Sequence, residues 1–150
     1  MEPINDYMMN DHREVDAIFE RARDAAAAAD WAGLERDCER FLARIERHIE
    51  MEEEILFPAF DEASGMAGVG PSQTMCEEHA LMRPMFAQMR EAAKAHDGKR
   101  YLEVSQTLYE LLHPHNMKEE QMMYPMTDRA LGPDGARQLV VELKERALAP

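Results

Sequence analysis

Residues 48–61 read HIEMEEEILFPAFD, and residues 115–128 read HNMKEEQMMYPMTD. Each stretch carries His-x-x-x-Glu and a second Glu, then an aromatic residue, Pro and, three positions later, Asp. The two stretches start 67 positions apart, and the same offset separates further matched pairs: His12 and His79, Phe19 and Phe86, Arg23 and Arg90, Ile45 and Leu112. Such self-similarity indicates two copies of one structural unit. Because neither copy could close a core alone, we expect both to form one domain over residues 1–150.

The composition is that of one globular domain. With 150 residues, of which 45% are hydrophobic, the chain can bury a core without disulfides. Its net charge is -13, with 30 acidic residues against 17 Lys and Arg. This balance argues against nucleic acid and against anionic membranes as partners, since both need a basic face. The 13 methionines are interpreted as flexible core filler rather than as metal ligands.

Two cysteines and the amino-terminal residues suggest where the protein resides. Cys38 and Cys76 form no C-x-x-C pattern, which predicts reduced thiols in a cytoplasmic protein. Residues 1–10 are polar and do not resemble a signal peptide. No run approaches the ~20 apolar residues that a membrane span needs.

Gly- and Pro-containing breaks divide the chain into helical segments. We expect long helices over residues 5–30, 30–60, 72–95 and 99–130, with a short fifth helix at about 134–148. Asp30 and Ser72 are the expected N-caps of the second and third helices. No segment alternates with period two for long enough to predict a strand. Four amphipathic helices with short connections predict an all-α, up-down-up-down four-helix bundle over about residues 5–130.

Each of the four long helices places one histidine on its apolar stripe, at ~100° per residue. Two of these histidines are followed one helical turn later by a glutamate on the same face. A single histidine on an apolar face is more often a core residue than a ligand. Two buried carboxylates, however, cost several kcal/mol each unless they are paired or bound to cations. We therefore predict that six residues bind metal: His12, His48, Glu52, His79, His115 and Glu119.

The ligand types narrow the choice of metal. Imidazoles and carboxylates without thiolates suit iron, manganese or zinc. Four imidazoles and two carboxylates are too many for one tetrahedral zinc ion. They fit two six-coordinate metals, each bound by two histidines and bridged by both glutamates, and bundle cores are known to hold such dinuclear sites.

The motif set resembles the haemerythrin-like (HHE cation-binding) family. The resemblance covers about residues 5–130 and rests on four elements that agree in type, order and spacing: Asp11-His12, His48-x-x-x-Glu52-Glu53, Glu78-His79 and His115-x-x-x-Glu119-Glu120. It implies a non-haem di-iron centre in a four-helix bundle, with the six residues above as ligands. The two glutamates would bridge the irons, together with an oxo or hydroxo group.

One position departs from the oxygen-carrying haemerythrins, whose third helix carries His-x-x-x-His. Here Arg83 stands four residues after His79, so one imidazole is missing and each iron would keep an open position. The equivalent position in the first repeat is Asp16. We expect Asp16 and Arg83 to lie at one level, a turn from the metals, where they either pair and orient a ligand or remain in water.

Three neighbouring residues are expected to stay outside the ligand set. Glu53 and Glu120 point off the ligand face, which predicts surface pairs or hydrogen bonds to the ligands rather than metal contacts. Tyr124 is placed at ~180° from the ligand face on a regular helix.

These observations favour a di-iron protein that binds or senses a small ligand, O2 or NO, or iron itself. The alternative is a di-iron enzyme of the peroxidase, catalase or oxidase type, which would act on peroxide or oxygen with the same ligands. A third reading is a bundle that the metal only holds together; its metal-free form would be unstable. The sequence leaves open whether the protein is an enzyme and whether it forms oligomers.

Overall fold

The computed structural model describes residues 3–149, in which every regular element is a helix. The predicted all-α class is confirmed. Two of the elements, η1 and η2, are single π-helical turns, and each joins the helices on its two sides into one rod. In chain order the elements are α1 (Pro3–Ala27), α2 (Trp31–Met51), η1 (Glu52–Leu56), α3 (Phe57–Ser64), α4 (Pro71–Lys94), α5 (Gly98–Lys118), η2 (Glu119–Met123) and α6 (Tyr124–Leu148).

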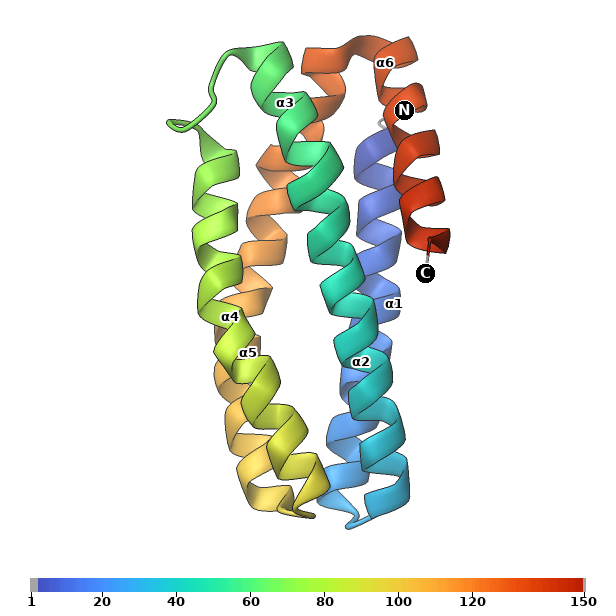
Figure 1. Ribbon diagram of the computed structural model, residues 1–150, viewed down its shortest axis with the longest axis vertical. Helices are drawn as coiled ribbons and strands as arrows, with labels where there is room; N and C mark the ends of the chain where they lie inside the picture. The colour runs from blue at the N-terminus through green and yellow to red at the C-terminus, as the bar shows by residue number, and fades with distance from the viewer. Residues whose placement is uncertain (1–2, 150) are drawn as a thin grey trace.

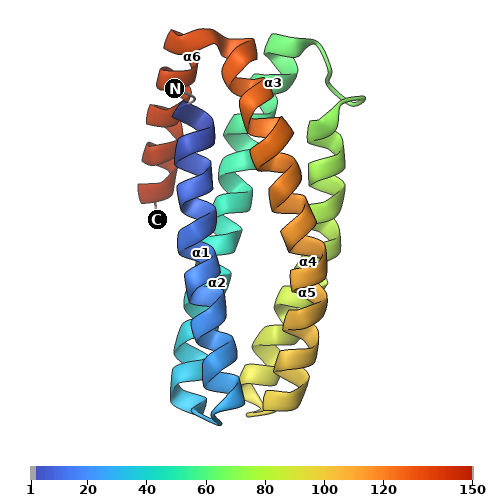
Figure 2. The ribbon, with the colours of Figure 1, turned by 180° about the vertical axis from the view of Figure 1, so that it is seen from behind.

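Four long rods lie side by side along the long axis of the molecule (Figure 1). They are α1, the α2–η1–α3 rod, α4, and the rod made of α5, η2 and the first part of α6. The α1–α2 and α4–α5 turns lie at one end, and the α3–α4 loop lies at the other (Figures 1 and 2). Helix α1 packs against α2, α5 and α6, whereas α4 packs against α5 and α2.

The two turns at the lower end of Figure 1 follow the repeat. Asp30 accepts a hydrogen bond from the Gly33 N–H at 3.1 Å, and Asp97 accepts one from the Arg100 N–H at 3.1 Å. The residue before each aspartate has a left-handed backbone, with φ of 56° and 53°. Both turns therefore end one helix and start the next with the same chemistry, and the predicted N-cap at Asp30 is confirmed.

The start of the third long helix differs from the expectation. Gly70 is the N-cap of α4, so the prediction that Ser72 caps it is wrong. The Ser72 hydroxyl instead donates to Asp61, the last residue of the first motif, at 2.6 Å. Asp128, at the same place in the second motif, accepts the first N–H groups of α1 at 3.0 and 3.1 Å. The aspartate of each repeat thus contacts the start of a helix in the other.

The expected break at residues 131–135 is a single non-helical residue within α6. Gly132 has φ 75° and ψ 172°, a conformation open to glycine, and the chain turns there and runs back beside α1 (Figure 1). Gly132 thus separates two helical segments that together carry the label α6, and the second of them covers the region of the expected short last helix. Its Leu139 and Leu143 are buried among residues of α1 and α3.

The π turns change which residues face the bundle interior. The Phe57 N–H bonds to the Glu52 carbonyl, and the Tyr124 N–H bonds to the Glu119 carbonyl, so each bond spans five residues. In a regular α-helix, residue i+5 lies about 140° around the axis from residue i. A π turn brings it back above residue i. Phe57 and Tyr124 thus lie directly beyond the two motif glutamates.

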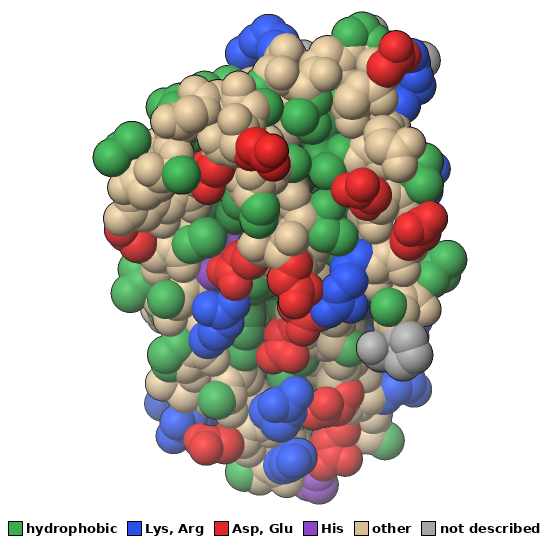
Figure 3. Space-filling model, turned by 45° about the horizontal axis from the view of Figure 1, so that its top comes forward, with side chains coloured by type: hydrophobic (Ala, Val, Ile, Leu, Met, Phe, Trp, Pro, Cys, Tyr) green, Lys and Arg blue, Asp and Glu red, His purple; other side chains and the backbone are tan. Residues whose placement is uncertain are grey.

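The interior has two apolar clusters with a polar layer between them. One cluster fills the end near the α1–α2 and α4–α5 turns, and it includes Phe41, Phe86 and Leu108. The other fills the end near α3 and α6, and it includes Met8 and Phe60. On the surface shown in Figure 3, Lys and Arg side chains lie among Asp and Glu side chains. Among residues 3–149, no helix combines the length and apolar character needed to cross a bilayer.

Candidate metal centre

The polar layer contains all six residues that the sequence singles out as metal ligands. Each of them is at most 5% exposed, and the two glutamates are 0% exposed. The four histidines form two pairs: the rings of His12 and His48 are 4.6 Å apart, and those of His79 and His115 are 4.9 Å apart. All four histidines lie within regular α-helices, so the 3.6-residue period turns each of them towards the bundle interior.

Each glutamate contacts both histidine pairs. Glu52 directs Oε2 towards His48 Nε2 at 3.6 Å and Oε1 towards His79 Nε2 at 3.2 Å. Glu119 directs Oε1 towards His12 Nε2 at 3.1 Å and Oε2 towards His115 Nε2 at 3.4 Å. We call the first group of candidate metal-ligand atoms site 1: His12 Nε2, His48 Nε2, Glu52 Oε2 and Glu119 Oε1. We call the second group site 2: His79 Nε2, His115 Nε2, Glu52 Oε1 and Glu119 Oε2.

Three buried ligand atoms of site 2 make no hydrogen bond among the described residues: Glu52 Oε1, Glu119 Oε2 and His79 Nε2. Glu52 Oε1 and His79 Nε2 lie 3.2 Å apart, but their geometry is not that of a hydrogen bond. Leaving such atoms unpaired in an apolar interior costs several kcal/mol, so native structures rarely contain them without a reason. The ligand atoms of Glu52, His79, His115 and Glu119 all lie within 4.8 Å of one another, and those of His12, His48 and Glu119 do so too. These residues therefore fit a bound metal ion.

An outer carboxylate holds each histidine by its other nitrogen. His48 Nδ1 lies 2.8 Å from Asp11, and His115 Nδ1 lies 2.7 Å from Glu78. His12 Nδ1 lies 2.8 Å from Glu120, and His79 Nδ1 lies 2.8 Å from Glu53. A proton on Nδ1 leaves the Nε2 lone pair facing the interior, which is the tautomer that binds metal. The expectation that Glu53 and Glu120 hydrogen-bond to the ligands is thus confirmed.

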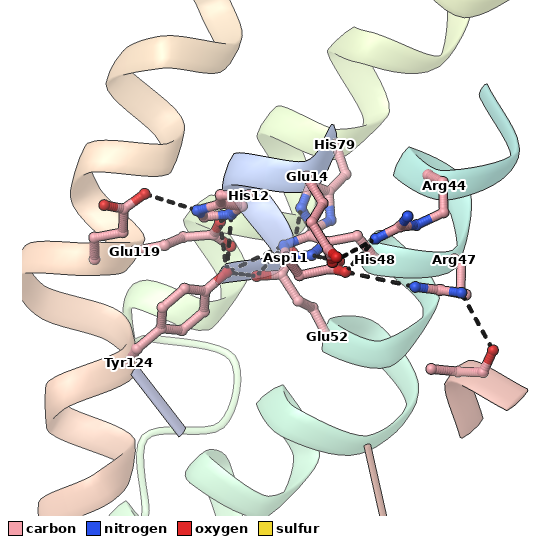
Figure 4. Close-up of polar contacts among 12 residues, drawn as sticks. Asp11, His12, Glu14, Arg44, Arg47, His48, Glu52, His79, Glu119 and Tyr124 are labelled. Atoms are coloured by element: carbon pink, nitrogen blue, oxygen red, sulfur yellow. Dashed lines mark hydrogen bonds and ion pairs between the residues drawn. The ribbon is translucent and has the colours of Figure 1, made fainter. Parts of the chain in front are cut away.

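Basic side chains lower the pKa of two of the outer carboxylates, Asp11 and Glu78. Arg44 donates to Asp11 at 2.8 Å, and Arg47 lies 3.5 Å from the same oxygen (Figure 4). Although burial raises the pKa of Asp11, His48 and Arg44 outweigh it and lower the pKa to about 2. Glu78 pairs closely with Lys118, and that contact together with His115 lowers the Glu78 pKa despite partial burial. Both carboxylates therefore remain charged and keep accepting from their histidines.

His12, His48 and His115 favour protonation when no metal is present, because the pKa of each is raised. Burial alone would lower the pKa of His48, but Glu52 and Asp11 raise it well above 6.5. Burial would lower the pKa of His115 as well, yet Glu119 raises it to about 9. Protons thus compete with metal for these nitrogens, and metal binding must displace them.

Tyr124 lies inside the centre, which corrects the expectation that it faces away. Its side chain is fully buried, and its hydroxyl oxygen lies within hydrogen-bond distance of four candidate metal-ligand atoms (Figure 4). It lies 2.7 Å from Glu52 Oε2, 3.0 Å from Glu119 Oε1, 3.1 Å from His12 Nε2 and 3.2 Å from His48 Nε2. A regular helix through Glu119 would turn Tyr124 away from the ligands, whereas the π turn rotates it onto the ligand face.

Asp16 and Arg83 do not occupy the positions expected of a pair. Arg83 donates to Glu53 at 2.9 Å, and its side chain is 52% exposed. Asp16 instead borders a small cavity beside the four histidines, which has room for about one water-sized molecule. Asp16, Leu112 and Asn116 line both this cavity and an outer pocket between α1 and α5. Desolvation raises the pKa of Asp16, and the opposing effect of His12 does not cancel it.

Comparisons with known proteins agree with this geometry. Residues 4–127 match the family described as the Hemerythrin HHE cation binding domain. The matched range includes all six candidate ligands, the four outer carboxylates and Tyr124. No curated protein and no solved structure was found to match the chain.

Proposed function

The chain belongs to the hemerythrin HHE cation-binding family, and we propose that it binds two iron ions and uses them to bind or sense a small ligand, O2 or NO, or iron itself. Site 1 and site 2 would each hold one ion through two histidine Nε2 atoms. Glu52 and Glu119 would bridge the two ions, and an oxo or hydroxo group would complete the bridge.

One observation carries the proposal: each buried glutamate offers one oxygen to each histidine pair. Two carboxylates at 0% exposure would repel unless cations lay between them, and these are either bound metal ions or, in the metal-free protein, protonated histidines. Two divalent or trivalent ions remove that repulsion and also use the unpaired atoms of site 2. Nitrogen and oxygen donors without thiolate suit iron, and a bound iron pair would supply reversible one-electron redox chemistry and exchangeable coordination positions.

The chain's own residues suit a small ligand. Val15, Ile45 and Met82 line the cavity beside the histidines, and its size excludes anything much larger than a diatomic molecule. The shared lining by Asp16, Leu112 and Asn116 is the entry path that we propose for the ligand. A ligand arriving there would meet the centre from the side opposite the apolar cluster that contains Tyr124.

Asp16 also favours a second candidate function, a peroxide-consuming enzyme. A carboxyl group with a raised pKa at the edge of the cavity could deliver protons to a substrate and take them back. A pure ligand carrier or sensor needs no such group. Peroxide or oxygen would then be turned over rather than only bound.

Metal analysis and ligand assays test these proposals. Protein purified without added metal, and protein reloaded with Fe(II) under anaerobic conditions, should contain two irons per chain and develop the absorption of an oxo-bridged diferric pair in air. The double variant Glu52→Gln/Glu119→Gln should bind little iron. Titration with NO or azide then measures ligand binding, while rapid consumption of peroxide would favour the enzyme. A single bound zinc, or no metal, would contradict the di-iron proposal.

A further inference from the structure

The two sites differ in one respect that the repeat does not predict. All four donor atoms of site 1 lie within 3.2 Å of one oxygen, the Tyr124 hydroxyl. At site 2 the repeat-related residue is Phe57. Its ring stacks on His79 at 6.0 Å and has no atom that could bind a metal. Among the eight candidate ligand atoms, the buried ones without a hydrogen-bond partner, Glu52 Oε1, His79 Nε2 and Glu119 Oε2, all belong to site 2. The centre is thus symmetric in its histidines and glutamates but asymmetric in this fifth group.

Resting on the proposed di-iron function, we propose that the Tyr124 oxygen is a ligand of the metal in site 1, so that small ligands bind at site 2. The phenol loses its proton to solvent as the oxygen–metal bond forms, and no electron is transferred. Site 1 then has two imidazoles, two carboxylate oxygens and one phenolate. Site 2 has two imidazoles and two carboxylate oxygens, and it keeps the exchangeable position.

The backbone holds Tyr124 in this place. The five-residue bond from its N–H to the Glu119 carbonyl sets the side chain directly over that glutamate. Its ring lies 5.6 Å from the ring of His12 and is fully buried in the apolar cluster of Met8, Met51 and Met123. A buried hydroxyl needs a partner, and here every partner within hydrogen-bond distance is a candidate metal ligand. A metal bound by those four atoms would therefore have the phenol oxygen beside it.

The two metal sites would therefore have different roles, although their histidines and glutamates are equivalent. The phenolate fills the position on site 1 that a small ligand would otherwise take. Phe57 contributes only apolar surface, so it leaves site 2 without a fifth protein donor. The earlier expectation of an open position on each iron is then replaced by one open position per pair.

Resonance Raman spectroscopy of the Fe(III)-loaded protein tests this inference, because a phenolate bound to Fe(III) gives a visible charge-transfer band with enhanced ring vibrations. The wild type should show these vibrations, and Tyr124→Phe should lose them while keeping two irons. Tyr101→Phe, which alters another fully buried tyrosine in the other apolar cluster, should keep them. The exchanged variant Phe57→Tyr/Tyr124→Phe should restore them. Azide titration should give one bound azide per iron pair in wild type and two in Tyr124→Phe.

The outcomes separate this inference from the function on which it rests. If the wild type holds two irons but shows no phenolate vibrations, Tyr124 is not a ligand and only this inference fails. The same conclusion follows if Tyr124→Phe keeps the band. If Tyr124→Phe does not fold, the wild-type spectrum and azide stoichiometry still decide. If the wild type holds no iron pair, both proposals fail together.

Discussion

The Nδ1 atom of His12 lies 2.8 Å from an oxygen of Glu120, a residue 108 positions further along the chain. The repeat supplies the counterpart, in which His79 Nδ1 lies 2.8 Å from Glu53. In both cases the second glutamate of one motif orients a histidine of the other repeat. Neither repeat can therefore complete its own set of oriented histidines, which agrees with two half-units forming one centre.

Removing Glu120 should weaken metal binding without removing a metal ligand. Glu120→Ala leaves His12 free to rotate or to change tautomer, so we expect about 10- to 100-fold weaker binding of one metal. Competition with a chelator of known affinity measures the loss. Glu53→Ala should act similarly through His79. Glu39→Ala, which removes only a surface partner of Arg90, is the control and should leave affinity unchanged. Equal affinities for all three variants would contradict the orienting role.

Chelation should destabilise the fold. The buried Glu52 and Glu119 lose their cations when metal is removed, and stability falls by the binding term, about 2.7 kcal/mol for a ligand at 100 times its Kd. Thermal melting followed by circular dichroism, with and without chelator, measures the difference. Glu52→Gln/Glu119→Gln should melt at the same temperature in both conditions, because it binds little metal. A wild type that is indifferent to chelator would count against a metal within the centre.

Much of the centre could be predicted from the sequence because its geometry is local. His48 and Glu52 are four residues apart on one helix, so their shared face depends only on the helical period. The repeat then places the second His–Glu pair at the same height. The structure brings these six side chains together for that reason. The outer bonds of Asp11 and Glu78 join different helices, and spacing along one helix does not predict such contacts.

Tyr124 could not be placed by the same reasoning. An angle of 100° per residue holds only while each N–H bonds four residues back, and at η2 the bond spans five. A signal was present in both motifs. Pro58 and Pro125 lack an N–H and clash with the carbonyl four residues before, so a regular helix cannot pass through them unchanged. A proline six positions after each ligand glutamate pointed to a local change in helix geometry.

Two arginines that contact outer carboxylates should differ in importance. Arg44 binds Asp11, which is 4% exposed, so Arg44→Ala leaves a buried charge short of one partner. We expect a loss of about 1.5–3 kcal/mol, towards the lower end because Arg47 also lies near Asp11. Arg83 is 52% exposed, and Arg83→Ala should cost less than ~1 kcal/mol. Urea denaturation of the metal-loaded variants provides both values, and the reverse order would contradict the burial argument.

Blocking the space between the outer pocket and the inner cavity should slow ligand entry. Asn116→Trp places a large ring where the two spaces share their lining, so the association rate of NO should fall while iron content stays constant. Stopped-flow mixing of the reduced protein with NO measures the rate. Lys99→Trp, on the exposed surface near the α4–α5 turn, is the matched control. An unchanged rate in Asn116→Trp would show that the ligand enters elsewhere.

The metal-free protein should lose stability as the pH rises through the pKa values of its buried histidines. The pKa of His115 is about 9 in the fold and about 6.5 in the unfolded chain, so protonation favours folding. This contribution, at most about 3 kcal/mol, is fully present below pH 6.5 and is lost as the pH rises towards 9. His48 acts in the same direction. Glu52 has a lowered pKa, so its contribution is present above pH 4.5 and is lost in acid.

Metal-free stability should therefore be greatest between about pH 4.5 and 6.5. The loaded protein should behave differently above that window, because metal binds neutral imidazole and affinity rises as proton competition ends. Urea denaturation in chelator and in excess metal, at matched pH values, tests both statements. His115→Gln should flatten the metal-free profile, whereas His113→Gln, at an exposed histidine stacked on Tyr109, should not. If metal-free stability instead increased from pH 6.5 to 9, the buried histidines would not be the cations that balance Glu52 and Glu119.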